Sequence, residues 1–224
     1  MKQLVLIVLF FTTTFLVFSQ EESKKSGLGF YVYGGVQIPE LKNIDAFLST
    51  NGYPLFDNEH FSAGFALYKE TDKIVNTVEI FAYNKSRTSL GNFSSLSVLS
   101  GSLSIGYKLF SDSEKYDLIP SIALNVYQAS LRTSAAPTTQ IAYPTYLSNG
   151  SQEEISGLGI GTSANITALF YPFKNWKSFH FGFKAGYNYT ASLEWQTINN
   201  YNVTDVPETE LLGANISLLI GLKF

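Results

Sequence analysis

The sequence contains no cysteine, two histidines and few charged residues. The absence of cysteine excludes disulfides, thiolate zinc sites, a cysteine nucleophile and a lipid-modified N-terminal cysteine. Charged residues make up 15% of the chain, compared with about 25% in ordinary soluble domains. The net charge is −3, so no excess of basic residues favours nucleic acid as a partner. So low a charge content is expected when a wide band of the surface faces hydrocarbon.

A long apolar run occurs only at the start of the chain. Lys2 precedes a mostly apolar run over residues 4–18, and Val17 and Ser19 supply the small-to-medium residues that precede a cleavage point. The run of about 15 residues is shorter than the roughly 20 residues that a membrane-spanning helix needs. We therefore expect a secretory signal peptide over residues 1–19, a short charged lead over residues 20–26, and no helical membrane protein.

Residues 27–224 form one domain in which apolar and polar positions alternate. In the last stretch, Leu211 to Phe224, every second residue from Leu212 onward is apolar and the positions between are mostly small or polar. Side chains point alternately to the two faces of a β-strand, so this stretch predicts a strand with one apolar face. Seven earlier stretches have the same pattern: residues 27–37, 61–69, 74–85, 96–110, 116–132, 155–171 and 178–195.

The connections between these eight strands alternate in length. Those after the first, third, fifth and seventh strands have about 10–23 residues, and the others about three to six, which is typical of outer-membrane barrels. The pattern predicts an all-β protein, an eight-stranded antiparallel up-and-down transmembrane β-barrel with both termini periplasmic. A soluble lipocalin-type barrel would place the apolar residues inside. The inward set here is Gly, Ser, Asn, Lys and Glu, which is too small and polar for a lipid-filled interior.

The eight strands, the signal peptide and the final residues LLIGLKF resemble the small outer membrane β-barrel family, the porin-like barrels of the OmpX/OmpA type. The resemblance covers residues 27–224. It implies a location in the bacterial outer membrane, with membrane lipid and the barrel-assembly machinery as partners. The assembly signal that the resemblance implies is carried by Leu218, Ile220, Leu222 and Phe224.

Two opposite charges are expected inside the barrel. Glu79 on the third strand and Lys184 on the seventh face each other across a lumen just wide enough for side chains to fill. They either form an ion pair that plugs the lumen or are each satisfied by other interior groups and water. We expect Lys108 and Lys223 near the periplasmic rim, where solvent can reach them. The further polar lumen candidates are Lys108, Asn125, Asn165, Asn188 and Asn215.

The long connections are the candidate recognition segments. Residues 39–50 predict a helix opened by Pro39, and residues 86–95 predict a polar loop. The apolar stripe of the helix either caps the barrel mouth, touches a partner, or packs locally within its loop. Loops 38–60 and 133–154 are the candidates for an extracellular ligand. The stripe consists of Leu41, Ile44, Phe47 and Leu48.

No constellation of residues predicts catalysis. His60 is expected at a loop end and His180 inside the periplasmic half of the barrel, so the two histidines do not cluster. No nucleophile elbow occurs, and we expect no catalytic residue, metal or cofactor. The expected role is structural or adhesive, exerted through extracellular loops above a filled lumen. The alternatives are a small porin or passive channel and an outer-membrane enzyme that modifies lipid A.

Overall fold

A computed structural model describes residues 26–57, 59–110, 115–134, 152–173, 178–190, 194–197 and 212–224. The predicted signal peptide and most of loop 133–154 lie outside the described residues. Within these ranges, no helix is long and apolar enough to cross a membrane.

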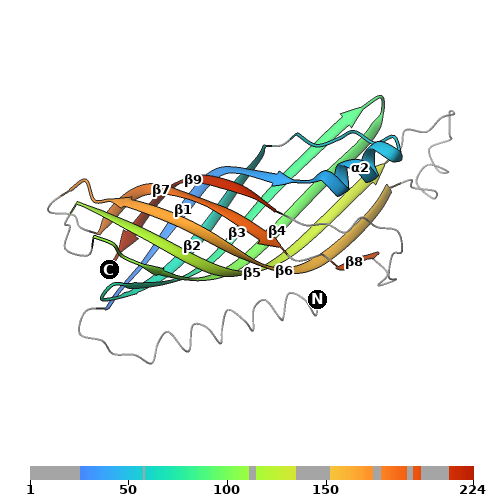
Figure 1. The fold of residues 1–224 in the computed structure, drawn as a ribbon. Helices are drawn as coiled ribbons and strands as arrows, with labels where there is room; N and C mark the ends of the chain where they lie inside the picture. Colours follow the sequence, from blue (N-terminus) through green and yellow to red (C-terminus); the bar gives the residue numbers. More distant parts are fainter. Residues whose placement is uncertain are drawn as a thin grey trace.

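Nine strands and one helix make up the described fold (Figure 1). The helix, α2, spans Lys42–Thr50. The strands are β1 (Ser26–Glu40), β2 (His60–Thr71), β3 (Ile74–Ser89), β4 (Asn92–Tyr107), β5 (Tyr116–Ser134), β6 (Gln152–Phe170), β7 (Phe179–Thr190), β8 (Glu194–Thr197) and β9 (Leu212–Lys223).

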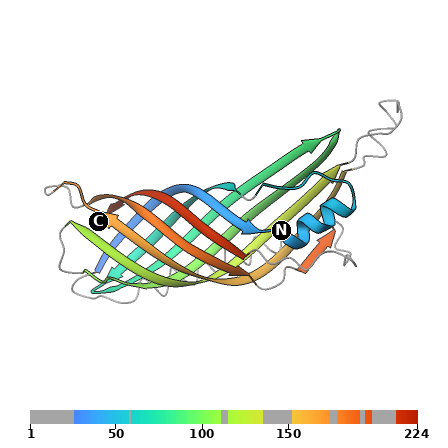
Figure 2. The same ribbon diagram turned by 45° about the horizontal axis from the view of Figure 1, so that its top comes forward.

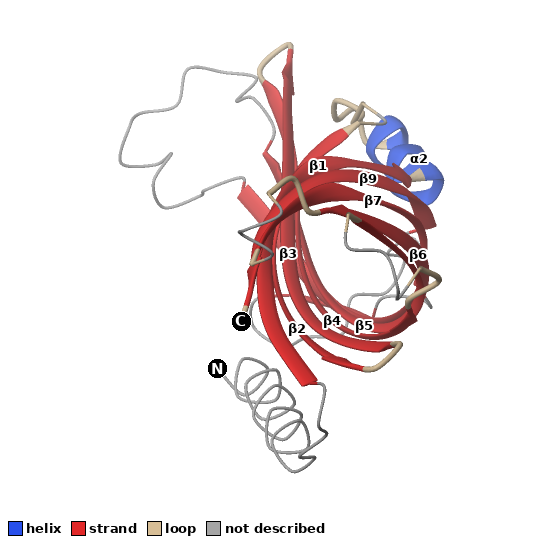
Figure 3. Cartoon of the chain, turned by 90° about the vertical axis from the view of Figure 1, so that its left-hand side faces the viewer, coloured by secondary structure: helices blue, strands red, loops and turns tan. Residues whose placement is uncertain are grey.

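The strands close into a barrel with eight positions. Every pairing is antiparallel, β1 pairs with both β2 and β9, and the β5–β6 pairing completes the ring. β7 and β8 pair with successive parts of β6, so they occupy one position and reduce nine strands to eight. Figure 3 shows the resulting closed ring in a view along the barrel. The predicted eight-stranded antiparallel barrel is confirmed, with the seventh strand interrupted.

Apolar side chains cover the outside of the barrel wall. On β9, Ile216, Leu218 and Ile220 are 56–61% exposed, whereas the intervening Ser217 and Leu219 are buried. The same alternation runs along the other strands, and it places polar residues in the lumen. The prediction that the apolar face points outward is therefore confirmed, and the inverted arrangement of a lipocalin-type barrel is wrong.

The predicted polar loop over residues 86–95 is wrong, because both strands continue through it. β3 runs to Ser89 and β4 begins at Asn92, and only Leu90 and Gly91 form the turn. Both turn residues have positive φ, 50° and 84°, as a type I′ hairpin turn requires. Residues 86–91 are all exposed, so neither face of the hairpin tip is buried and no alternation of apolar residues marks it in the sequence.

The predicted helix begins later than expected. Pro39 belongs to β1, where it pairs with Gly213 of β9, and α2 begins only at Lys42. The β1–β2 ladder ends at Gln37, so residue 39 has a neighbouring strand on one side only. A proline is tolerated at such an edge position because its missing N–H is not needed there.

We call the two ends of the barrel the α2 end and the terminal end. The α2 end carries α2 and the β3–β4 hairpin, while the terminal end carries the C-terminus (Figures 1 and 2). The hairpin reaches further than the neighbouring strand β2 at the α2 end.

Candidate functional site

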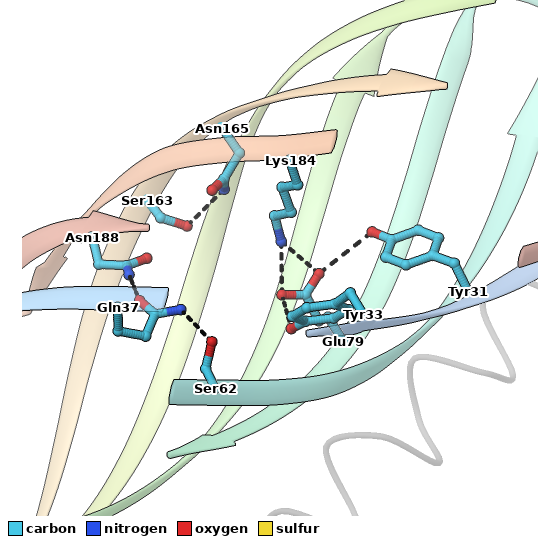
Figure 4. Close-up of polar contacts among 9 residues, drawn as sticks. All are labelled: Tyr31, Tyr33, Gln37, Ser62, Glu79, Ser163, Asn165, Lys184 and Asn188. Atoms are coloured by element: carbon cyan, nitrogen blue, oxygen red, sulfur yellow. Dashed lines mark hydrogen bonds and ion pairs between the residues drawn. The ribbon is translucent and has the colours of Figure 1, made fainter. Parts of the chain in front are cut away.

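An ion pair crosses the middle of the lumen. Glu79 of β3 accepts hydrogen bonds from Lys184 Nζ of β7, at 2.7 Å to Oε1 and 2.6 Å to Oε2. Tyr33 Oη donates to Glu79 Oε1 at 2.6 Å, and Tyr31 Oη lies 3.4 Å from Oε2. Figure 4 shows these side chains converging from three strands. The structure thus brings together the two charges that the sequence placed in the lumen, and it adds two tyrosines.

Amides and hydroxyls fill the lumen on the α2 side of this pair. Asn188 donates to Gln37 at 3.2 Å, and the amide of Gln37 lies 3.4 Å from the Ser62 hydroxyl. Asn165 donates to Ser163 at 3.1 Å (Figure 4). Asn125 and Asn215 are also buried on the lumen side. All four asparagines named from the sequence therefore lie inside the barrel.

Little empty space remains around the ion pair. Two small cavities adjoin Lys184, one of about 20 Å³ towards Tyr31 and Tyr68, and one of about 10 Å³ towards Asn125 and Asn215. A buried water needs about 10–15 Å³ of such volume. Each cavity is therefore about the size of a single water molecule, and side chains occupy the rest of this section of the lumen.

A second ionic cluster closes the terminal end. Lys108 Nζ lies 2.7 Å from Glu70 Oε1 and 3.0 Å from Asp117 Oδ2, and all three side chains are less than a tenth exposed. Lys223 also pairs with Glu70, and Tyr171 donates to Asp117 at 2.9 Å. The expectation that Lys108 and Lys223 are simply solvated at the rim is therefore wrong.

The sequence contained a signal for this cluster that the reading of single strands missed. Glu70 is the next inward position of β2 after Ser62, Gly64, Ala66 and Tyr68. An inward carboxylate at the end of a lumen requires a cation nearby, since an unpaired buried charge costs several kcal/mol. Lys108 is the inward residue that follows the end of β4.

Neither histidine lies at an accessible site. His180 is fully buried in the lumen, with its ring 5.8 Å from that of Tyr68 and 5.9 Å from that of Tyr171. His60 is also fully buried, and its ring contacts those of Phe56 and Tyr83 at the α2 end. In the part of the chain that the structure describes, no three His, Asp or Glu side chains are grouped to hold a metal ion.

The helix α2 covers the α2 end. Ile44 and Leu48 are completely buried, Leu41 is nearly so, and Phe47 is partly buried. The sequence left three roles open for this stripe: capping the barrel mouth, touching a partner, or packing locally. Its burial within the chain excludes direct contact with a partner. The stripe belongs to one buried cluster with inward residues of β4 and β5: Leu96, Val98, Ala129 and Leu131.

The segment after α2 is attached to the β3–β4 hairpin. Asn92 donates to the carbonyl oxygen of Gly52 at 2.8 Å, and Ser94 donates to that of Pro54 at 2.7 Å. Asp45 on α2 accepts a contact of 3.4 Å from the backbone N–H of Phe56. Burial raises the pKa of the Asp45 carboxyl, and the Phe56 N–H opposes that rise. The candidate recognition loop 38–60 is thus a folded cap.

The C-terminal residues of the implied assembly signal line the outer wall of β9. Leu218 and Ile220 are exposed, Leu222 is half-buried, and Phe224 is 75% exposed. The Phe224 ring stacks against Phe30 of β1 at 6.1 Å, and its N–H bonds to the carbonyl oxygen of Leu28. The last residue is therefore tied to the first strand where the barrel closes.

Comparison with known proteins identifies the fold and no closer kinship. No protein-family model matches this sequence, and no curated protein is significantly similar to it. Among solved structures, a major outer membrane protein from Thermus thermophilus matches 88% of this chain and 99% of its own length, with a TM-score of 0.55 and 10% identity.

A second solved structure is that of Ail, the attachment invasion locus protein of Yersinia pestis, in complex with the heparin analogue sucrose octasulfate. It matches 89% of this chain and 98% of its own length. Its TM-score is 0.50 and its identity is 10%. Identities this low establish the fold alone. The chain has the fold of the small outer membrane β-barrels, and the resemblance drawn from the sequence is confirmed at that level.

Proposed function

We propose that this protein is an integral outer-membrane barrel with a closed lumen, no catalytic role and an extracellular end that recognises other molecules. The exposed apolar wall supports the membrane location, because residues such as Leu218 and Ile122 are 61% and 67% exposed and suit hydrocarbon rather than water. The apolar start of the sequence supports export with removal of residues 1–19.

The different shapes of the two ends of the barrel support the proposed orientation. The terminal end has the β2–β3 turn of Asp72 and Lys73, whereas the α2 end carries the helical cap and the long hairpin. Short turns are typical of the periplasmic side and larger connections of the extracellular side. Both termini are therefore periplasmic, and the outward residues Leu218 to Phe224 face the lipid, where the assembly machinery would meet them.

The closed lumen is the observation that favours recognition over transport. The Glu79–Lys184 pair spans it, the Lys108 cluster closes the terminal end, and the cavities of about 20 and 10 Å³ beside Lys184 leave no continuous passage there. An eight-stranded barrel has only enough interior for its own side chains. A passive channel would need an opening that the packed side chains do not leave.

Single-channel recording tests the closed lumen. We expect the purified full chain in a planar lipid bilayer to produce no stable conductance steps. Heat-modifiable electrophoretic mobility of the protein recovered from the same lipid verifies that it is inserted in folded form. Regular steps from the wild-type protein would overturn the closed-lumen proposal and favour a small porin.

Mass spectrometry of lipid A tests the non-catalytic part of the proposal. Both histidines are buried, His180 within the lumen and His60 beneath the cap, so neither is placed to act on a lipid at the outer wall. We expect identical lipid A acyl patterns in a strain with the protein and in a deletion strain. A difference restored by the wild-type gene would favour an enzyme that modifies lipid A.

A further inference from the structure

The β3–β4 hairpin leaves one sheet edge without a partner. β3 pairs with β2 only as far as Tyr83, opposite Ser62, but it pairs with β4 as far as Ser89, opposite Asn92. β2 begins at His60, which this register places opposite Lys85. Along residues 86–89, β4 lies on one side, and among the described residues no strand lies on the other. Figures 1 and 2 show this part of the hairpin extending past β2. An unpaired edge is a template for a further strand.

The hairpin turn determines which backbone groups face the open edge. In a hairpin with a two-residue turn, the flanking pair, here Ser89 and Asn92, exchanges both hydrogen bonds. Hydrogen bonding alternates along an antiparallel strand, so Arg87 and Lys85 also bond to β4. The N–H and C=O groups of Ser86 and Thr88 consequently point away from β4, towards the open edge.

The side chains of the same stretch bear two positive charges that share one carboxylate. Lys85 Nζ lies 3.2 Å from Asp57 Oδ2, and Arg87 also pairs with Asp57. Lys85 further donates to the backbone oxygen of Glu59 at 3.0 Å. Two cations therefore share the single carboxylate that pairs with them. A strand that brings carboxylates of its own to this edge is favoured over one that brings positive charges.

The tip of the hairpin supports a role in contact. Leu90 is 99% exposed and has a φ of 50°, a conformation that suits Gly or Asn far better than a bulky residue. An apolar side chain at a strained, fully exposed position gains nothing within this chain. The bond from Asn92 to Gly52 holds the hairpin in place, so an incoming strand would meet an ordered edge.

We infer that the edge of β3 over residues 86–90 binds an extended acidic segment of another protein as an added strand. The backbone of Ser86 and Thr88 pairs with the segment, Lys85 and Arg87 bind its carboxylates, and Leu90 contacts an apolar residue. This inference rests on the proposed function, since the edge must lie outside the cell. Strand addition gives affinity through the main chain and specificity through alternating side chains.

Peptide binding to the full-length protein in detergent micelles tests the inference. The probe is a fluorescein-labelled peptide of alternating Glu and Val. Its controls are the same peptide with N-methylated backbone positions and a peptide of alternating Lys and Val. We expect the Glu peptide to bind at least about tenfold more tightly than either control, a difference of about 1.4 kcal/mol. Equal binding of the N-methylated peptide would overturn strand addition, because N-methyl groups block backbone pairing and leave the charges unchanged.

Variants of the edge separate its backbone from its charges. Ser86→Pro with Thr88→Pro removes the two edge-facing N–H groups, leaves the bonds to β4, and is expected to abolish binding. Lys85→Glu with Arg87→Glu is expected to reverse the preference towards the Lys peptide. Asp57→Asn removes the competing carboxylate and is expected to tighten binding of the Glu peptide severalfold. Retained binding by the proline variant, if it still shows heat-modifiable electrophoretic mobility, would overturn the inference.

Two further measurements distinguish the other outcomes. The first is binding of sucrose octasulfate. If the protein binds this compound but not the Glu peptide, and if binding requires Lys85 and Arg87 but persists in the proline variant, the two cations belong to a site for a sulfated glycan and the inference is overturned.

The second is labelling on intact cells. Because the chain lacks cysteine, Thr88→Cys introduces a single thiol that a membrane-impermeant maleimide can label. Absence of labelling with peptide binding retained in micelles would contradict the extracellular placement, whereas labelling without peptide binding would contradict the strand addition alone.

Discussion

The Glu79–Lys184 pair makes the strongest prediction about stability. Glu79→Gln keeps the shape of the side chain and removes its charge, which leaves the Lys184 ammonium, only 12% exposed, without a counter-ion. The adjoining cavities of about 20 and 10 Å³ offer room for about one water each. Removing one partner of a buried pair costs about 3–5 kcal/mol, and we expect a loss of unfolding free energy in that range.

The double variant isolates the interaction between the two charges. In Glu79→Gln with Lys184→Gln, no unpaired charge remains, and a neutral replacement for a buried pair often restores the lost stability. We therefore expect the double variant to be more stable than either single variant by about 2 kcal/mol or more. Urea unfolding in lipid vesicles, followed by tryptophan fluorescence, measures the free energy of unfolding of the wild type, of Glu79→Gln, of Lys184→Gln and of the double variant.

A matched control uses the exposed pair of Arg132 and Glu154, whose side chains are 47% and 26% exposed. Glu154→Gln makes the same chemical change where solvent screens the charges, and we expect it to cost no more than about 1 kcal/mol. The reasoning is refuted if Glu79→Gln costs as little as this control. It is also refuted if the free energy of unfolding of the double variant is no higher than that of the less stable single variant.

Three further predictions concern the two ends of the barrel. Lys108→Met leaves the buried Asp117 carboxylate without a cation and Glu70 with Lys223 alone, so we expect it to lower the urea midpoint by an amount equivalent to about 3 kcal/mol. Ile44→Ala removes a fully buried side chain of α2 and is expected to cost about 2–5 kcal/mol of cap stability, measured as faster protease cleavage within residues 41–57 while the barrel stays intact. The raised pKa of Asp45 means that its charged form opposes docking of the cap above that pKa, and that the opposition is relieved as the pH falls through it. The cleavage rate of the wild type relative to Asp45→Asn should therefore decrease between neutral pH and about pH 4, and an unchanged ratio would contradict this assignment.

Much of the barrel could be predicted because one physical constraint repeats along the chain. Each strand must present apolar atoms to one side and small polar atoms to the other, so the period of two recurs. The same phase placed Glu79 and Lys184 inside, and the lumen is so narrow that two inward charges on facing strands must come close. The structure brings their atoms within 2.7 Å.

The Lys108 cluster and the start of α2 depend on how neighbouring strands are aligned, which the sequence of a single strand does not specify. The contacts between Lys108, Glu70 and Asp117 join β2, β5 and the end of β4. Their proximity is set by the stagger between strands, which alternation does not specify. The start of α2 was misplaced because Pro39 suits both a helix opening and an edge of a strand, and the end of the β1–β2 ladder decides between them.

The part of the sheet that protrudes can be recognised in the sequence, because the apolar residues there change from the outward face to the inward face. Along β4, the inward residues change from Ser102 and Ser100 to Val98 and Leu96, all four of them buried. The outward positions change in the opposite sense, and Ser97 and Ser95 follow Leu99.

β5 repeats this inversion, since outward Leu124 gives way to Arg132 while inward Asn125 gives way to Leu131. A wall in lipid is apolar outside, whereas a sheet in water needs its apolar face inside. The inversion therefore marks where the barrel leaves the membrane. Beyond that level the sheet has an apolar inner face that must be covered, and the buried stripe of α2 covers it.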